Sequence, residues 1–487
     1  MMTLPQPIAL EALARRAGAS VRGDAAATVS DLAYDSREVT RGSLYFCIAG
    51  ARADGHDFAA AAVAAGAVAL VCERPLDLDV PQIVVPSVRK AMGPMSAAAF
   101  GDPSRAITVA GVTGTNGKTT TTFLIEQCFA ALGMTTGLLG TVETHIAGAV
   151  EPAGRTTPES VDLQRMLARM RAAGVTGATM EVSSHGLAMG RVDGVRYACA
   201  TFTNLTQDHL DFHETMEDYF AAKAMLFDPS RSGVGAINAD DEYGRRLASG
   251  TEIEHVTFGL EHEADVRATD VVMGAGGSRF VCVTPAVRVP VSVRLAGPFN
   301  VSNALAALAT MYALGLDVEK AAAGIEAMPG VPGRFERVDD GEEFTVLVDY
   351  AHTPDSVERV LRAAREICRG RLVVVVGCGG DRDRAKRPLM GASAVALADR
   401  AILTSDNPRS EEPRAIIAEM EQGARETGRP YEVEVDRRAA IRAAVRDARP
   451  GDVIVIAGKG HESGQEFAGH TVPFDDRAVA REEIAAR

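Results

Sequence analysis

The sequence has no pair of cysteines at the spacing of a metal site or of a disulfide-stabilised fold. Its seven cysteines are scattered over 487 residues, and no Cys-x-x-Cys motif occurs. An odd number of dispersed cysteines is typical of reduced thiols in the cytosol. We therefore expect a cytoplasmic protein without structural disulfides and without a cysteine-bound zinc.

Positive charge and long apolar runs are also scarce. The chain has 51 Lys and Arg residues against 65 Asp and Glu, a formal net charge of −14. Phosphate backbones and anionic membranes select basic surfaces, so we expect no nucleic-acid partner, although one bound nucleotide stays compatible. The longest apolar run, residues 58–72, is mostly Ala and Gly and is shorter than the ~18 residues of a membrane span. Residues 1–10 lack a signal-peptide pattern, and we expect no membrane insertion.

One motif organises the rest of the chain. A short apolar run, residues 107–110, leads into Gly114, Thr115, Asn116, Gly117, Lys118, Thr119 and Thr120, and a helical pattern follows over residues 121–132. Strand, glycine-rich turn, Lys-Thr and helix form the layout of a phosphate-binding loop. Backbone N–H groups and the helix N-terminus hold phosphate oxygens, while the Lys118 ammonium reaches the β/γ-phosphates and the Thr119 hydroxyl ligates Mg²⁺. The strict pattern has glycine where this chain has Val112, so the match is not literal.

The remaining patterns predict an α/β protein of three units, consistent with ~150 residues per domain. Residues 1–102 contain a helix at 8–17 and short strands at 42–48, 67–72 and 82–85. Residues 103–332 contain strands at 135–142, 176–182 and 198–204 separated by helices such as 160–173, which predicts a mainly parallel sheet. Residues 333–487 alternate strands (344–348, 371–376, 400–403, 431–435, 452–456) with helices (355–367, 392–398, 414–421, 437–447). This last unit is Rossmann-like, although no Gly-x-Gly-x-x-Gly fingerprint follows its first strand.

Acidic and histidine residues follow two strands of the central unit. Glu181 ends one strand and His209 follows another, and in a parallel sheet such ends lie at the ligand-binding edge. With Thr119 they are candidate Mg²⁺ ligands, although His209 is equally consistent with a structural hydrogen bond. Lys223 lies in an apolar helical segment, where it either extends its head to solvent or lies near the phosphates.

Three loops of the last unit would meet at one sheet edge. They contain Arg382, then Asp406 to Arg409, then Gly458 to Glu462. Arg382 and Arg409 are suited to grip carboxylates, and Glu462 to hold an ammonium. Their convergence indicates an amino-acid site, against the alternative of ordinary loop salt bridges.

Taken together these motifs resemble the Mur ligases, which build the peptidoglycan stem peptide. The resemblance covers all three units and rests on eight stretches: Gly-Thr-Asn-Gly-Lys-Thr (114–119), Glu-Val-Ser-Ser-His-Gly-Leu (181–187), Asn-Leu-Thr-Gln-Asp-His-Leu-Asp (204–211), Gly-Pro-Phe-Asn-Val-Ser-Asn (297–303), Gly-Arg-Phe-Glu (333–336), Asp-Tyr-Ala-His-Thr-Pro (349–354), Asp-Asn-Pro-Arg (406–409) and Gly-Lys-Gly-His-Glu (458–462). It is greatest to the members that add the third residue, and Asp-Asn-Pro-Arg resembles the version specific for meso-2,6-diaminopimelate rather than L-lysine.

The resemblance implies an N-terminal domain that binds the uridine nucleotide, a central ATPase domain and a C-terminal domain that delivers the amino acid. The implied substrates are ATP, UDP-N-acetylmuramoyl-L-alanyl-D-glutamate and meso-diaminopimelate. The implied metal ligands are Thr119, Glu181, His209 and Lys223 as a CO₂-derived carbamate. Besides residues 114–120, ATP would be served by Asn300, Asn303, Arg334 and Asp349. The muramyl dipeptide substrate would be held by Ser36, Thr156, Thr157, Ser183 and Arg191. Diaminopimelate would be bound by Arg382, Asp406, Asn407, Pro408, Arg409, Gly458 and Glu462.

One position departs from this pattern. The subfamily often has glutamine two residues before the substrate-binding arginine, and this chain has Met189. A polar contact to the substrate is therefore open to question.

The expected reaction activates a carboxylate as an acyl phosphate, which the amine of the amino acid then attacks. Charge neutralisation by Lys118 and Mg²⁺ is its main requirement, and we expect Lys118, Lys223, Glu181 and His209 to carry the chemistry in a monomer. The alternatives are the L-lysine-adding version, a folylpolyglutamate synthetase, and a P-loop regulator that binds ATP without ligating. Arg409 opposes lysine, which has no second carboxylate, and the first unit opposes the folate enzyme.

Overall fold

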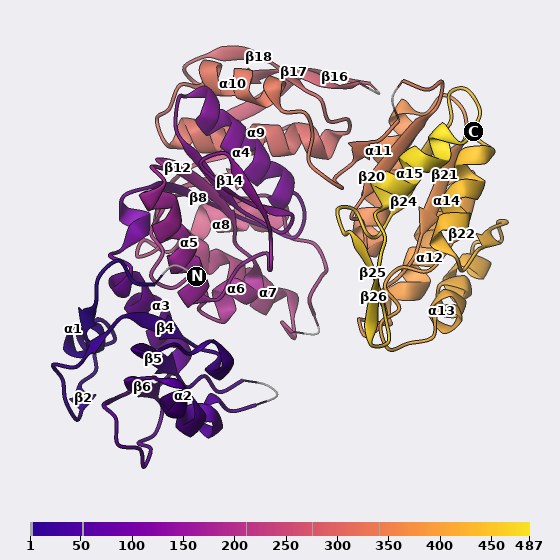
Figure 1. Ribbon diagram of the computed structural model, residues 1–487. Helices are drawn as coiled ribbons and strands as arrows, with labels where there is room; N and C mark the ends of the chain where they lie inside the picture. Colours follow the sequence, from indigo (N-terminus) through magenta and orange to yellow (C-terminus); the bar gives the residue numbers. More distant parts are fainter. Residues whose placement is uncertain (1–2, 51–52, 211, 275, 340) are drawn as a thin grey trace.

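The computed structural model describes residues 3–50, 53–210, 212–274, 276–339 and 341–487 and builds them around three main sheets (Figure 1). Asp211, the last residue of the 204–211 motif, lies outside the described residues. No sheet formed by the described residues crosses position 102 or 332. The domain boundaries drawn there stay predictions.

The first sheet lies in the indigo part of the chain (Figure 1). Its order is β2–β7–β6–β5–β4, with β4 to β7 parallel and β2 antiparallel. The strands are β2 (Val21–Arg22), β4 (Asp31–Ala33), β5 (Ser43–Phe46), β6 (Ala69–Cys72) and β7 (Gln82–Val84); the helices are α1 (Leu10–Arg16), α2 (Ala59–Ala65) and α3 (Val88–Ala99). Residues 8–9 form a short strand, β1 (Ile8–Ala9), paired with β3 (Thr28–Val29), rather than the start of the predicted helix.

The second sheet is built around β8 (Thr108–Thr113), which lies between β12 (Gly177–Glu181) and β13 (Tyr197–Phe202). Its other strands are β9 (Thr136–Leu139), β10 (Glu143–Ile146), β11 (Ala149–Pro152), β14 (Ser232–Asn238), β15 (Glu254–Gly259), β16 (Val266–Gly274), β17 (Gly277–Val283) and β18 (Arg288–Val293). Pairing is parallel from β9 through β16 and antiparallel at both edges. The mainly parallel sheet is thus as predicted. The edge hairpins were not predicted, although alternation of apolar and polar residues, as at the start of β16, is a strand signal.

Helices cover both faces of this sheet. Ala110 and Val112 of β8 pack in one apolar cluster with α4 (Lys118–Ala131), α9 (Pro298–Ala313) and α10 (Val318–Ala327). Ile107 and Val109 pack in the opposite cluster with α5 (Ser160–Ala172), α6 (Ser184–Ala188), α7 (Met216–Ala224) and α8 (Glu242–Gly250). Because both faces are buried, the strands are continuous runs of apolar and small residues. The strand before the phosphate loop is longer than predicted, and α4 begins earlier, at Lys118 itself.

The third sheet, drawn in orange and yellow, has the order β19–β20–β24–β21–β22–β23 (Figure 1). Its strands are β19 (Glu336–Arg337), β20 (Thr345–Asp349), β21 (Leu372–Val376), β22 (Arg400–Leu403), β23 (Glu432–Val433) and β24 (Val453–Ala457). One face packs against α11 (Pro354–Ile367), α12 (Lys386–Leu397) and α13 (Pro413–Glu426), the other against α14 (Arg437–Arg446) and α15 (Asp476–Ala485). The predicted alternation is confirmed, except that α12 begins six residues before its predicted start at 392. A hairpin, β25 (Gly464–Phe467) and β26 (His470–Pro473), follows β24.

Two findings agree with what the composition predicts. The seven cysteines form no disulfide, and six of them are buried. In the described part of the chain no helix has both the length and the apolar character needed to cross a membrane.

Polar side chains join the first unit to the second, and two glycines pack closely within the third. Tyr34 Oη donates to Asp162 Oδ2 at 2.6 Å, and the Arg165 guanidinium lies 3.1 Å from the Asp31 carboxylate. Within the third unit, Gly333 lies against Gly460, where a Cβ on Gly333 would be 2.2 Å from the Gly460 carbonyl carbon. The Gly-Arg-Phe-Glu and Gly-Lys-Gly-His-Glu motifs therefore pack backbone against backbone, which only glycine allows.

The first prediction concerns the buried ion pair that joins α14 to α15. Arg437 and Asp476 are fully buried and their side chains lie 2.6 Å apart. Breaking such a pair leaves a buried charge uncompensated, so Asp476→Asn should lower the free energy of unfolding by about 3 kcal/mol. Urea titration followed by circular dichroism measures this. The matched control Glu482→Gln, at an exposed pair with Arg438, should cost less than about 1 kcal/mol; equal losses would contradict the prediction.

The second prediction concerns His461, whose ring lies 5.3 Å from that of Tyr350. Burial, assisted by the charge of Arg334, lowers the pKa of His461 to about 4. The unfolded chain, with a histidine pKa of about 6.5, therefore takes up the proton first as the pH falls. This site should cost up to about 3 kcal/mol of stability between pH 6.5 and pH 4.

Thermal unfolding at pH 7 and pH 5 tests this. His461→Gln should lose less stability between these two pH values than the wild type does. The exposed control His470→Gln should follow the wild type. An identical pH dependence in all three proteins would show that His461 is not the group responsible.

Candidate active site

A pocket of about 210 Å³ lies where β8, β12 and β13 end, with one wall from the third unit. Residues 115–119 of the phosphate loop line it. The other predicted site residues of the central unit in its lining are Thr156, Glu181, Ser183, His209 and Lys223. Arg334 lines it from the third unit, beside Tyr350, His352 and Thr353. The pocket therefore gathers residues that the sequence spreads over more than 230 positions.

The phosphate loop is held by backbone geometry that requires glycine. Gly114 and Gly117 have φ of +148° and +85°, and a Cβ on them would lie 1.9 Å from Thr203 Oγ1 and 2.3 Å from Asn303 Oδ1. The end of β13 ties the loop down, since Asn116 N donates to Asn204 Oδ1 at 2.9 Å. The first N–H groups of α4 are thus fixed beside the pocket, as an anion site needs.

Two lysines converge on one carbonyl of this loop. Lys118 Nζ donates to the carbonyl oxygens of Gly114 at 2.9 Å and Thr115 at 2.8 Å, and Lys223 Nζ donates to the same Gly114 oxygen at 2.7 Å. The Lys223 side chain is buried, and its ammonium lies 4.6 Å from the Tyr219 ring centroid. The alternative of a lysine head in solvent is therefore wrong.

Burial lowers the pKa of both lysines. Burial, followed by the neighbouring charge of Lys118, lowers the pKa of Lys223 well below its usual value. Burial also lowers the pKa of Lys118, against the opposing charge of Glu181. These shifts favour the neutral amine, the nucleophilic form, more than in an exposed lysine, while the Glu181 charge opposes the shift at Lys118.

The predicted metal ligands share the pocket but differ in how they are held. Glu181 is buried, and its Oε1 accepts from Thr141 N at 2.7 Å. Thr119 Oγ1 accepts from the Arg334 guanidinium at 3.2 Å. His209, with φ of +54°, has its ring 4.9 Å from that of His185.

A carboxylate and a hydroxyl are the hard donors that Mg²⁺ prefers, so Glu181 and Thr119 fit this ion. Among the described residues, no three His, Cys, Asp or Glu side chains are grouped to hold a metal. As an ammonium Lys223 cannot ligate a metal, and its amine nitrogen suits Mg²⁺ poorly because this ion prefers oxygen; it would add a carboxylate-like ligand only if it were modified.

Sequence reasoning missed Asp208, which lines the same pocket. Burial opposes its ionisation, but the charges of His209 and His352 and a backbone hydrogen bond outweigh it, so the pKa of Asp208 is lowered. The residue was part of the quoted 204–211 motif, and its place at a strand end was the available signal.

Only some of the residues predicted for the muramyl substrate line the pocket. Thr156 and Ser183 line the pocket, whereas Thr157 is buried, donating to the Glu181 carbonyl at 2.9 Å. Arg191 lies 3.0 Å from Glu159 Oε1 and 3.3 Å from Met189 Sδ, so the residue that replaces the usual glutamine contacts the arginine predicted to bind the substrate. Ser36 lies in the first unit, in the short 3₁₀ helix η1 (Ser36–Glu38), and is not among the residues that line the pocket.

The residues predicted for ATP fall into two groups. Asn300 and Asn303 are buried near the start of α9 behind the loop, with Asn303 Nδ2 donating to Asn300 Oδ1 at 3.2 Å. Asp349 accepts from the N–H groups of Phe335 at 2.6 Å and Ala351 at 2.7 Å. It thereby fixes the turn that carries Arg334, whose guanidinium lies 4.5 Å from the Tyr350 ring centroid.

The three loops of the third unit meet as predicted. Asn407 Nδ2 donates to Glu462 Oε2 at 2.7 Å, and a Cβ on Gly458 would lie 2.3 Å from Asp406 Oδ2. Arg409, with φ of +53°, lies 2.8 Å from Glu466 Oε2 and donates to the Gly380 carbonyl at 2.8 Å. Arg382 is exposed and donates to the Asp381 carbonyl at 3.1 Å. Their roles in binding, and that of Pro408, stay predictions.

A bridge that sequence reasoning also missed joins these units at the pocket. Asp355, in the first turn of α11, accepts through Oδ2 from Asn116 Nδ2 at 3.1 Å and from Thr206 Oγ1 at 3.2 Å. The third unit thus contacts the phosphate loop directly.

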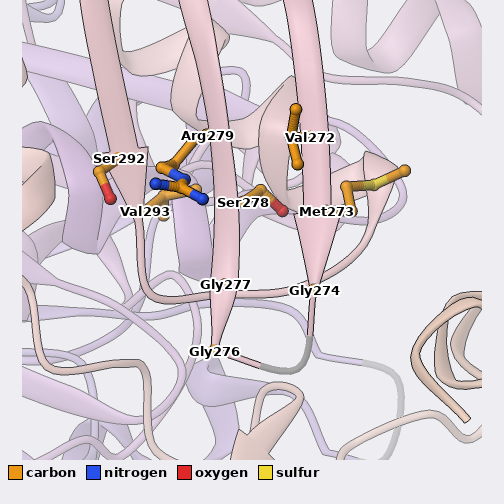
Figure 2. A pocket seen from close by; sticks show the side chains of 9 residues that line it. All are labelled: Val272, Met273, Gly274, Gly276, Gly277, Ser278, Arg279, Ser292 and Val293. Carbon is orange, nitrogen blue, oxygen red and sulfur yellow. The ribbon is translucent and has the colours of Figure 1, made fainter.

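A second hollow, of about 380 Å³, lies apart from these residues. Figure 2 shows it between the ends of β16, β17 and β18, lined mostly by glycine and short side chains. Arg279 is the charged side chain in its lining. It contains none of the predicted site residues.

Comparison with known proteins agrees over nearly the whole chain. Three family models match: the Mur ligase family catalytic domain over residues 28–100, the Mur ligase middle domain over 112–311, and the Mur ligase glutamate ligase domain over 333–460. The UDP-N-acetylmuramoyl-L-alanyl-D-glutamate--2,6-diaminopimelate ligase of Streptomyces avermitilis is 50% identical, over 94% of this chain and 93% of its own. The enzyme of that name from Geobacillus thermodenitrificans is 49% identical, over 94% and 95%.

Solved structures give the same result. A UDP-N-acetylmuramoyl-L-alanyl-D-glutamate--2,6-diaminopimelate ligase superposes with a TM-score of 0.72 at 33% identity, over 99% of both chains. Mycobacterium tuberculosis folylpolyglutamate synthase, solved with ADP and AMPPCP, shares the fold with a TM-score of 0.62 at 20% identity, over 74% of this chain and 91% of its own. With its phosphate loop, paired lysines and converging third-unit loops, the chain belongs to the Mur ligase family.

Proposed function

We propose that this protein joins meso-2,6-diaminopimelate to the D-glutamate of UDP-N-acetylmuramoyl-L-alanyl-D-glutamate, using ATP, in the synthesis of peptidoglycan precursors. The observation that carries the proposal is the single pocket holding the phosphate loop, Lys223, Glu181 and Arg334. The names of relatives about 50% identical over most of the chain support the choice of substrates.

The residues suit a reaction in which two anions must meet. The γ-carboxylate of the substrate attacks the γ-phosphorus of ATP, the bond to ADP breaks, and an acyl phosphate results. The amine of the amino acid then attacks the acyl carbon, and phosphate leaves from a tetrahedral intermediate. Lys118, Arg334 and the α4 N–H groups supply positive charge where the phosphates meet the carboxylate. The third unit, which already contacts Asn116, shields the acyl phosphate from water.

Magnesium and a modified lysine complete this proposal. We assign Thr119, Glu181 and His209 to Mg²⁺, which when bound would neutralise phosphate charge. Lys223 is assigned as a carbamate, because addition of CO₂ needs the neutral amine that its lowered pKa favours. The modification would turn a repelling cation beside Lys118 into an oxygen ligand.

The third-unit loops support diaminopimelate as the amino acid. Asp406, Asn407, Arg409, Gly458 and Glu462 are brought together, and a guanidinium at Arg409 matches a second carboxylate that L-lysine lacks. Arg382 would close on the same ligand from its exposed loop. We assign Ser36, Thr156, Thr157, Ser183 and Arg191 to the nucleotide substrate. All of these residues belong to one chain, consistent with a monomeric enzyme, which we place in the cytoplasm.

The experiment that tests this function is product formation. Given ATP, Mg²⁺, the nucleotide dipeptide and diaminopimelate, the purified protein should release ADP and yield the tripeptide mass. Lys118→Ala should abolish turnover, because the phosphates lose their cation. ADP release without dependence on the other two substrates would instead indicate a regulatory ATPase, and equal rates with L-lysine would defeat the specificity.

A further prediction tests the carbamate. Lys223→Ala should lose activity that bicarbonate does not restore, whereas a small carboxylic acid such as acetate restores part of it by occupying the vacated space. Activity with and without each additive is the measurement. Full activity of the unsupplemented variant would refute the role assigned to Lys223.

A further inference from the structure

A fully buried lysine connects the loops of the third unit. Lys459 follows β24, and none of its side chain is exposed. Its Nζ donates to Asn407 Oδ1 at 2.9 Å, to Glu462 Oε2 at 3.1 Å and to the Gly464 carbonyl at 2.6 Å. These three acceptors match the three N–H donors of one ammonium.

A buried ammonium is costly unless it is paired and fully hydrogen-bonded. Two partners of Lys459, Glu462 and Gly464, lie in its own segment between β24 and β25, whereas Asn407 lies in the loop after β22. One side chain therefore fixes these two segments relative to one another.

The first consequence concerns the Asn407 amide. An ammonium only donates hydrogen bonds, so it requires the oxygen of the amide to face it. Glu466 N donates to that same Oδ1 at 3.0 Å. The amide nitrogen is thereby turned toward Glu462 Oε2, at 2.7 Å, and Asn407 offers donors, which suit a carboxylate ligand.

The second consequence concerns Glu462. Its Oε2 accepts from both Lys459 and Asn407, which fixes the orientation of the carboxylate. The other oxygen, Oε1, is then the one an incoming ammonium meets. A displacement of about 1 Å in such a group can cost 10²-fold in rate.

We propose that Lys459 is a positioning residue for the amino-acid substrate: it holds the Asn407 amide and the Glu462 carboxylate in the orientations that receive a carboxylate and an ammonium. The inference rests on the proposed function, in which these loops bind diaminopimelate. Lys459 itself, being buried behind them, acts through its two partners.

The test is Lys459→Met, which keeps the length and removes the charge. The KM for diaminopimelate should rise tenfold or more, while the KM for ATP and for the nucleotide dipeptide change less than twofold.

The control Arg371→Met removes an ion pair to buried Asp452, 2.7 Å away at the opposite ends of the strands. It should reduce stability and leave all three KM values near those of the wild type. Should Lys459→Met fail to fold, Lys459→Gln, whose amide NH₂ keeps two N–H donors without the charge, should show a smaller rise confined to the same KM.

A double-mutant cycle with Glu462→Gln separates positioning from general loosening. If Lys459 acts through Glu462, the two changes in the diaminopimelate KM should be strongly non-additive. Additive effects, or equal rises in all three KM values, would overturn the proposal. A fall in that KM would overturn it too, since Lys459 would then compete with the substrate's ammonium.

A wild type that makes no tripeptide refutes the proposed function instead. Calorimetric titration of the wild type and the variant with diaminopimelate then tests the role of Lys459 by binding alone.

Discussion

The site depends on the Gly114 carbonyl, which accepts from two buried lysines at once. Lys118 and Lys223 approach it at 2.9 and 2.7 Å, and their repulsion contributes to the lowered pKa of Lys223. The arrangement brings two lysine side chains together at the place where anions are expected to bind, so phosphate oxygens or an added carboxylate would favour their charged forms. Much of the surrounding structure, from the left-handed glycines to Asn303 behind the loop, keeps this carbonyl in place.

The order of strands and helices in the parallel sheets can be predicted from the sequence because their apolar pattern is strong. Continuous apolar strands separated by amphipathic helices predict parallel sheets, and β12, β13, β22 and β24 lie within two residues of their predicted bounds. The antiparallel edge strands β10–β11 and β16–β18 were missed because they carry charged residues and lack the continuous apolar runs of the buried parallel strands. The start of α12 was missed because Lys386 and Pro388 at its beginning do not resemble an apolar face.

The candidate site shows where sequence reasoning ends. A motif identifies Lys118 and Glu181, since their neighbours in the chain are their neighbours in the pocket. The burial of Lys223 required the structure, because a lysine on an apolar helix can lie either way. Asp355 contacts a residue 239 positions away and Lys459 contacts Asn407, 52 positions away, and no local spacing encodes such contacts. Met189 departs from the family pattern, and its sulfur contacts Arg191, the arginine predicted to bind the substrate.

The Asp355 bridge has a consequence for how the molecule responds to its ligands. One carboxylate oxygen is shared by Asn116 of the phosphate loop and by Thr206, so rotation of the third unit must change the surroundings of bound nucleotide. By thermodynamic reciprocity, any ligand that alters that rotation alters nucleotide affinity by the same factor, and nucleotide alters its affinity in return. The order of substrate binding would then follow from the position of the third unit and from the hydrogen bonds that Asp355 accepts, with no separate effector site.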